Sequence, residues 1–205
     1  TAQQLENVTR EEALNHPTWD MGPKITVDSA TLVNKALEVI EARWLFGMPV
    51  EKIEVLIHPE SIVHSMVEFV DGALIAQRGT PDMRIPIQYA LSWPERTTGP
   101  GKTLSLKDMK RLTFEPVNPE ISRGLELGFE VARAGGSAPV VFNAANEQAV
   151  EEFLQNRIKF TDIINSIEYC LNKHSIEEEL SLEQLIAIDE WARNEVTEWI
   201  KQKVH

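Results

Sequence analysis

The sequence predicts an α+β protein, in which a first domain with a mixed sheet packed by helices is followed by a separate C-terminal helical bundle. Two observations predict this class. The clearest β-rich runs lie in the first half of the chain and flank an Asp71-Gly72 pair, which is typical of a hairpin turn. From residue 119 onward, apolar residues recur at helical spacing in four successive segments.

The first domain begins with a polar lead-in and a helix that is predicted over residues 29–46. Asp28 or Ser29 can accept hydrogen bonds from its first free amides, and Gly47 with Pro49 ends it. Further along the chain we expect a short β-rich run at 52–59, a hairpin at 61–79, and a loop that enters a short helix ended by Pro94.

The domain boundaries follow from a change in pattern. Residues 93–118 contain Pro and Gly turn signals with little periodicity, so they are predicted to be a linker. The first domain would then span 1–92 and the helical bundle 119–205. Because the chain starts Thr-Ala-Gln-Gln without Met, we expect an interior stretch of a longer protein, with the first domain incomplete at its N-terminus; a processed N-terminus is the alternative.

Composition narrows the class of partner. The 205-residue chain is 42% hydrophobic and 25% charged, and its net charge of −12 argues against nucleic acid. No apolar run approaches the length of a membrane span, so no membrane contact is expected. The single cysteine, Cys170, cannot form an internal disulfide, which favours a reducing, cytoplasmic location.

Asn34, Lys35 and Glu38 are spaced three and four residues apart, so their side chains share one face of the first predicted helix. A solvated stripe with a Lys35–Glu38 pair is one reading. The other is a phosphate site, because a helix N-terminus with the Ser29 hydroxyl, the Asn34 amide and the Lys35 ammonium offers the donors that phosphate oxygens need. Glu38 would then serve a divalent cation or a sugar hydroxyl, although one carboxylate does not make a metal site.

The segment HPTWDMG, residues 16–22, forms no regular element in the prediction. It suits a lid in which Trp19 and Met21 cover a ligand, His16 bonds it and Gly22 allows close backbone approach. A surface loop with its Trp anchored in a core groove is equally compatible.

Three other residues could be read as a site. His58 and His64 flank a β-rich run, but no third nitrogen or sulfur ligand lies at a useful spacing, so we interpret them as structural. Met83 precedes the short helix in GTPDMR, where a core position is the default and a ligand contact the alternative.

Five stretches together, HPTWDMG, VDSATLVNKALEVIEARWLF, EVLIHPESIVHSMV, GTPDMR and FNAANE, resemble the 1-deoxy-D-xylulose 5-phosphate reductoisomerase family over essentially the whole chain. The resemblance is to the family's C-terminal part. Its N-terminal NADPH-binding domain has no counterpart, and no G-x-G-x-x-G occurs in this sequence. The family's Asp-x-Glu metal segment and the serine and lysine before the lid are missing as well.

The resemblance implies roles for individual residues. Ser29, Asn34 and Lys35 would bind the substrate phosphate, while Glu38 would bind Mg²⁺ or Mn²⁺ and touch the substrate oxygens. His16 would bond the substrate from the lid, whose cover is formed by Trp19 and Met21. NADPH would meet Gly22 and Met83, and FNAANE would serve packing only.

The resemblance also implies the reaction and the assembly. The family converts 1-deoxy-D-xylulose 5-phosphate to 2-C-methyl-D-erythritol 4-phosphate in non-mevalonate isoprenoid biosynthesis, by a skeletal rearrangement to an aldehyde followed by reduction with NADPH. A homodimer formed through the sheet is expected, and the chain alone is expected to be inactive. Two other functions fit the residues: a stand-alone phosphosugar-binding or dimerisation module, and a related NADPH oxidoreductase acting on another polyol phosphate.

Overall fold

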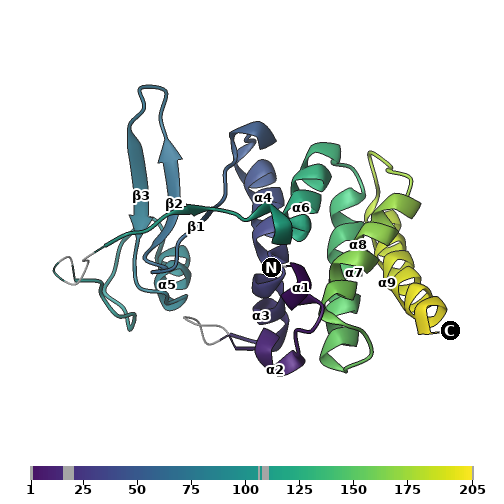
Figure 1. Ribbon diagram of the computed structural model, residues 1–205. Helices are drawn as coiled ribbons and strands as arrows, with labels where there is room; N and C mark the ends of the chain where they lie inside the picture. The colour runs from purple at the N-terminus through teal and green to yellow at the C-terminus, as the bar shows by residue number, and fades with distance from the viewer. Residues whose placement is uncertain (1, 16–20, 106, 108–110, 205) are drawn as a thin grey trace. The chain divides into compact units, whose positions relative to one another are not determined.

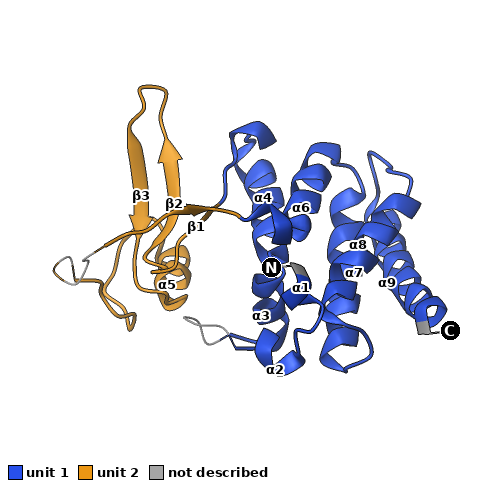
Figure 2. Cartoon of the chain, in the orientation of Figure 1, with its two compact units in different colours: residues 1–55, 118–205 blue, residues 56–117 orange. Residues whose placement is uncertain are grey.

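The computed structural model describes residues 2–15, 21–105, 107 and 111–204, and the chain divides into two compact units (Figures 1 and 2). Unit 1 comprises residues 1–55 and 118–205, and unit 2 comprises residues 56–117. Unit 1 is helical in its described part and unit 2 contains the strands. The α+β class predicted from the sequence is therefore confirmed.

The helices of unit 1 begin with two short ones and end with the longest. Its elements are α1 (Ala2–Leu5), α2 (Arg10–Ala13), α3 (Pro23–Ala30), α4 (Val33–Phe46), the 3-10 turns Val50–Lys52 and Pro119–Ile121, α6 (Arg123–Ala134), α7 (Ala138–Leu154), α8 (Phe160–Lys173) and α9 (Leu182–Val204).

The core of unit 1 is built around α7, which packs against α8, α9 and α3. Its buried residues Val141, Phe142, Ala145, Ala149 and Val150 recur at spacings of three and four, so the buried side of the helix is mostly apolar, with Asn146 as a polar residue within it. Small alanines let neighbouring helices approach closely. The four helices predicted after residue 119 are all present as α6 to α9.

The compact units differ from the predicted boundaries, which divided the chain at residues 92 and 118. Helices α3 and α4 pack with α6 and α7, so the helical unit includes residues from both ends of the chain. Close contact between α4 and α6 explains this. A Cβ on Gly128 would lie 2.3 Å from the Cβ of Ala36, and one on Gly124 would lie 2.6 Å from the Thr31 carbonyl oxygen.

Unit 2 is built on the predicted hairpin. Strands β2 (Val63–Glu68) and β3 (Leu74–Arg78) pair antiparallel, with Val67 opposite Ile75. Gly72 has a φ of +82°, which favours glycine, and the Ala73 amide donates to Asp71 Oδ1 over 3.0 Å. The Asp71-Gly72 turn is thus confirmed.

The rest of unit 2 contains less strand than expected. Of the predicted run 52–59, only β1 (Leu56–Ile57) is a strand, and it pairs antiparallel with β4 (Glu115–Pro116). The described strands therefore form two separate antiparallel pairs instead of one mixed sheet. Helix α5 (Arg84–Ser92) is present and ends before Pro94, as predicted. No helix in the described ranges is long and apolar enough to cross a membrane.

A buried serine ties the start of α7 to the segment after α8. Ser137 Oγ lies 2.7 Å from His174 Nε2 and accepts a hydrogen bond of 2.9 Å from the Glu177 amide. Burial lowers the pKa of His174, and the Glu177 charge opposes this only in part. A neutral imidazole can accept from the Ser137 hydroxyl, whereas an imidazolium cannot.

The lowered pKa of His174 predicts a pH dependence of stability. The unfolded chain binds a proton at this histidine more readily than the folded chain does, so its contribution is present above the ordinary pKa near 6.5 and is lost as pH falls. We expect the free energy of unfolding to drop between pH 7.5 and 5.5. The free energy of unfolding, measured by urea denaturation at several pH values, should depend less steeply on pH in His174→Gln. An identical pH dependence in both proteins would contradict the assignment.

Candidate active site

The predicted helix 29–46 is two helices with a sharp break between them. Gly22 is the N-cap of α3, which ends at Ala30, and α4 starts only at Val33. Leu32 lies between them with φ of +62°, a strained conformation for a branched residue. The Thr31 hydroxyl lies 3.2 Å from the carbonyl oxygens of Val27 and Asp28 and donates back to the end of α3.

This break corrects the predicted cap. Ser29 lies near the C-terminal end of α3, so neither it nor Asp28 caps the helix that carries Asn34 and Lys35. The positive end of a helix dipole instead falls at Val33 to Lys35, where amides of the first turn lack partners within the helix. Asn34 and Lys35 themselves therefore stand at the positive end of the α4 dipole.

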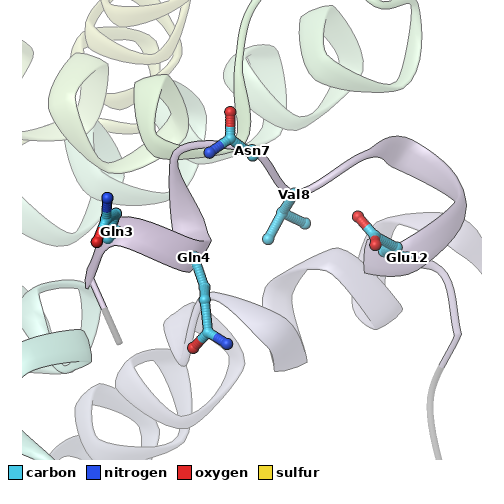
Figure 3. Close-up of a pocket in the computed structure, with 5 residues that line it drawn as sticks. All are labelled: Gln3, Gln4, Asn7, Val8 and Glu12. Atoms are coloured by element: carbon cyan, nitrogen blue, oxygen red, sulfur yellow. The ribbon is translucent and has the colours of Figure 1, made fainter.

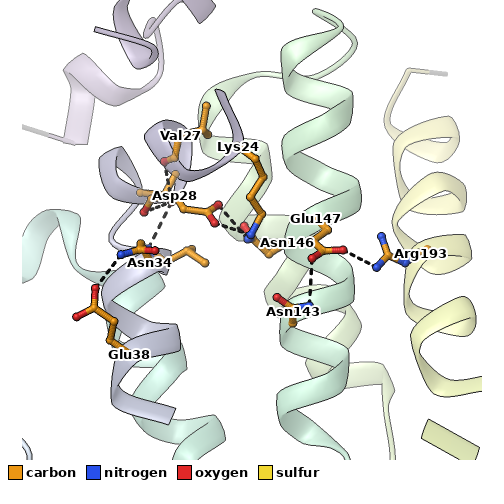
Figure 4. Close-up of polar contacts among 11 residues, drawn as sticks. Lys24, Val27, Asp28, Asn34, Glu38, Asn143, Asn146, Glu147 and Arg193 are labelled. Carbon is orange, nitrogen blue, oxygen red and sulfur yellow. Dashed lines mark hydrogen bonds and ion pairs between the residues drawn. The ribbon is translucent and has the colours of Figure 1, made fainter. Parts of the chain in front are cut away.

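Asn34 and Lys35 both direct their side chains to Glu38. Asn34 Nδ2 donates to Glu38 Oε1 over 2.8 Å, and Lys35 Nζ donates to Glu38 Oε2 over 2.5 Å (the first bond is drawn in Figure 4). The Lys35 and Glu38 side chains are 39% and 44% exposed. Exposed pairs of this kind contribute about 0 to 1 kcal/mol, so a ligand can replace them at little cost.

Asn34, Lys35 and Glu38 form a triad on α4, whereas Ser29 lies near the C-terminal end of α3, before the break. It is half-buried, and its hydroxyl makes no hydrogen bond to any residue that the structure describes. The hydroxyl is therefore available to a ligand. The sequence spacing alone placed Asn34, Lys35 and Glu38 on one face, and the structure brings these three together.

The lid and cofactor residues are placed only in part. His16 and Trp19 lie outside the described residues. Met21 is half-buried directly before Gly22, at the start of α3. A Cβ at Gly22 would meet nothing within 4 Å, and its φ is −62°, so nothing in the described chain requires a glycine there.

Met83 belongs to unit 2, where it precedes α5 and is 58% exposed. It is not a core residue. The neighbouring Asp82 carboxylate accepts hydrogen bonds from the Arg84 side chain and amide, and these hold the pKa of Asp82 well below its usual range. The ion pair fixes the turn that presents Met83.

The two histidines beside the hairpin make structural contacts. His58 stacks on Phe114 with ring centroids 4.6 Å apart, and its Nδ1 lies 2.7 Å from the Thr113 carbonyl oxygen. His64 Nε2 lies 3.2 Å from the carbonyl oxygen of Gly79. Among the residues described, no group of three or more His, Cys, Asp or Glu side chains could hold a metal ion.

A surface pocket lies elsewhere, in the N-terminal segment of unit 1 (Figure 3). It has a volume of about 620 Å³, and it is lined by Gln3, Gln4, Asn7, Val8 and Glu12. None of the predicted site residues lines it. The triad on α4 therefore remains the candidate site on chemical grounds.

We did not identify from the sequence the residues of α6 and α7 that pack against α3 and α4, the helices that carry the candidate site. Gly128 allows α6 to touch α4 at Ala36, and buried Asp28 bonds Asn146 of α7. The GLELG spacing in α6 places two glycines on one helix face and was the available signal for the first contact. No local signal pairs residues 28 and 146.

Comparisons with known proteins agree with the motifs. The family model for the DXP reductoisomerase C-terminal domain matches residues 79–195, and that for the 1-deoxy-D-xylulose 5-phosphate reductoisomerase C-terminal domain matches residues 1–46. The reductoisomerase of Acetivibrio thermocellus is 52% identical over 97% of this chain and 52% of its own length. That of Exiguobacterium sibiricum is 55% identical over 94% and 50%.

Solved structures give the same result. A crystal structure of DOX-P reductoisomerase in complex with NADPH, fosmidomycin and magnesium matches 98% of this chain and 52% of its own, with a TM-score of 0.92 and 42% identity. The Zymomonas mobilis enzyme in complex with NADPH has a TM-score of 0.89, with 42% identity and the same coverage. The chain thus spans about half the length of the relatives it matches. One family model covers more than half of the chain, and the chain therefore belongs to the 1-deoxy-D-xylulose 5-phosphate reductoisomerase family.

Proposed function

We propose that this chain supplies the C-terminal half of an NADPH- and divalent-metal-dependent enzyme that converts 1-deoxy-D-xylulose 5-phosphate to 2-C-methyl-D-erythritol 4-phosphate. The observation that carries the proposal is the convergence of Asn34 and Lys35 on Glu38 at the start of α4, in a chain 52% identical to a reductoisomerase over 97% of its length. The reaction belongs to non-mevalonate isoprenoid biosynthesis.

The phosphate end of the substrate would be held by Ser29, Asn34 and Lys35. Their hydroxyl, amide and ammonium groups are all donors, and the first-turn amides of α4 add a favourable dipole. Binding energy from the phosphate can then be used to orient the reacting carbons, which lie elsewhere in the substrate.

Glu38 fits one position of a magnesium or manganese site. Its exposed carboxylate offers the oxygen ligands that hard cations prefer. The remaining metal ligands would come from residues other than those described in this chain. Such an ion, when bound, polarises a carbonyl and holds adjacent substrate oxygens. Because Glu38 is the acceptor for both Asn34 and Lys35, occupying its oxygens would release both donors to the phosphate.

The cofactor and lid roles rest on Gly22, Met83 and the segment before α3. Open space at the Gly22 Cβ position and the exposed Met83 side chain suit contact with NADPH, which supplies the hydride for the reduction. His16 would bond the substrate, while Trp19 and Met21 would exclude water from the reactive aldehyde.

A homodimer and a cytoplasmic location complete the proposal. Both faces of the β2–β3 hairpin expose apolar side chains, which suits burial against another surface. These exposed residues are Met66, Val67, Phe69, Val70, Leu74 and Ile75. The NADPH and magnesium in the matched crystal structures support the cofactor assignment.

The test is made on a completed enzyme, in which the N-terminal half of the Acetivibrio thermocellus relative is joined ahead of residue 1 of this chain. We expect it to consume NADPH, followed by absorbance, only when both substrate and Mg²⁺ or Mn²⁺ are present. We expect no turnover from the 205-residue chain alone. Failure of the completed enzyme, or comparable turnover by the chain alone, would overturn the proposal.

The same assay separates the rival functions. Turnover with a different polyol phosphate but not with 1-deoxy-D-xylulose 5-phosphate would indicate a related oxidoreductase. Phosphosugar binding by the chain alone, measured by calorimetry and without turnover in the completed enzyme, would indicate a binding module.

A further inference from the structure

A buried polar pair joins α3, directly before the candidate site, to α7 in the helical core. Asn146 Nδ2 donates to Asp28 Oδ1 over 3.0 Å, and Lys24 Nζ lies 2.5 Å from Asp28 Oδ2 (Figure 4). Asp28 is 1% exposed and Asn146 is 0% exposed. The pair spans 118 positions of sequence, so it is a tertiary link between separate segments.

Stability alone does not account for this pair. The Asn146 Oδ1 atom is buried and has no hydrogen-bond partner among the described residues. Turning the amide over would present this oxygen to the Asp28 carboxylate, so the orientation is fixed. A buried carboxylate and an unpaired carbonyl oxygen both cost free energy, and apolar residues of similar volume would avoid that cost.

Asp28 lies in the last turn of α3. Asp28 directly precedes Ser29, and its carbonyl oxygen lies within hydrogen-bond distance of the Thr31 hydroxyl just before the Leu32 break. Successive residues of a helix point about 100° apart. While Asp28 faces α7, Ser29 is therefore turned to another side, and a rotation of α3 would move its hydroxyl relative to Asn34.

We propose that Asn146, acting through Asp28, is a positioning residue for the phosphate end of the site. It fixes the rotation of α3 and thereby the distance of the Ser29 hydroxyl from the Asn34 and Lys35 donors. This inference rests on the proposed function and gives the FNAANE segment a role beyond packing.

The same helix offers a matched control. Asn143 Nδ2 donates to Glu147 Oε1 over 3.3 Å, and Glu147 Oε2 accepts from Arg193 of α9 over 2.6 Å. In Figure 4, Glu147 points toward Arg193 of α9, while Asn146 points to α3. Replacing either asparagine with alanine deletes one side-chain hydrogen bond of α7. Only the bond of Asn146 is made to α3, next to Ser29.

The experiment compares Asn146→Ala with Asn143→Ala in the completed enzyme. For Asn146→Ala we expect the KM for the phosphosugar to rise about tenfold, with kcat and the KM for NADPH changed less than about twofold. The inhibition constant of inorganic phosphate should rise by a similar factor. Asn143→Ala should leave all of these within about twofold of the parent.

A polarity exchange keeps the test valid if Asn146→Ala fails to fold. Asn146→Asp places two carboxylates face to face, whereas the double variant Asp28→Asn with Asn146→Asp restores one donor and one acceptor. We expect the double variant to recover the phosphosugar KM to within about threefold of the parent. Recovery of folding with a KM still raised tenfold would overturn the inference.

The outcomes separate the two proposals. Suppose that the completed enzyme without substitutions is active. If Asn146→Ala then behaves like Asn143→Ala, or lowers kcat without changing KM, this inference is overturned and the proposed function stands. A parent that neither turns over the phosphosugar nor binds inorganic phosphate in calorimetry overturns both.

Discussion

Replacing Glu38 with Gln in the completed enzyme is expected to lower kcat/KM by at least about a hundredfold. The substitution keeps the shape of the side chain and its bonding to Asn34, but it removes the charge that pairs with Lys35 and would attract a divalent cation. Half-maximal activity should require a higher Mg²⁺ concentration, and a titration of rate against Mg²⁺ measures both effects.

Glu41→Gln is the control for this prediction. Glu41 is an exposed carboxylate on the same helix, one turn after Glu38, so it tests the loss of one negative charge from α4 without touching the triad. We expect its kcat/KM to stay within about twofold of the parent. If both variants lost activity equally, general electrostatics rather than a ligand role would explain the result.

Replacing Gly128 with Val is expected to destabilise the folded chain by about 3 kcal/mol, which lowers Tm by about 6 to 12 °C. A Cβ at this position would lie 2.3 Å from the Ala36 Cβ and 2.8 Å from the Ala36 Cα. The second of these is a backbone atom, so α6 must move away from α4. Thermal unfolding followed by circular dichroism measures the change.

Moving a methyl group from residue 36 to residue 128 tests whether the contact between α6 and α4 causes the loss of stability. Gly128→Ala alone should destabilise the chain, even though alanine favours a helix over glycine by about 1 kcal/mol. Adding Ala36→Gly returns the space between the helices, so the double variant should regain much of the loss. Additive effects of the two substitutions would show that the close approach of α6 and α4 does not limit stability.

Local sequence signals predicted the elements well where neighbouring residues control the backbone. The Asp71-Gly72 turn is confirmed because only a few residues accept a positive φ, and glycine marks the position. Helices α6 to α9 are confirmed because their apolar spacing is local. The break at Leu32 was not predicted, because a leucine with positive φ carries no signal in sequence and the α4–α6 contact supports it from outside.

The candidate site was likewise predictable from the sequence only in part. Helical spacing by itself determined that Asn34, Lys35 and Glu38 share a face, since residues three and four apart lie side by side on any α-helix. Only the tertiary structure decided that α4 begins at Val33, that α3 and α4 pack with the C-terminal helices, and that Asp28 meets Asn146. Contacts between residues more than a hundred positions apart depend on how complete helices pack, and the residues near each partner in the chain do not encode that packing.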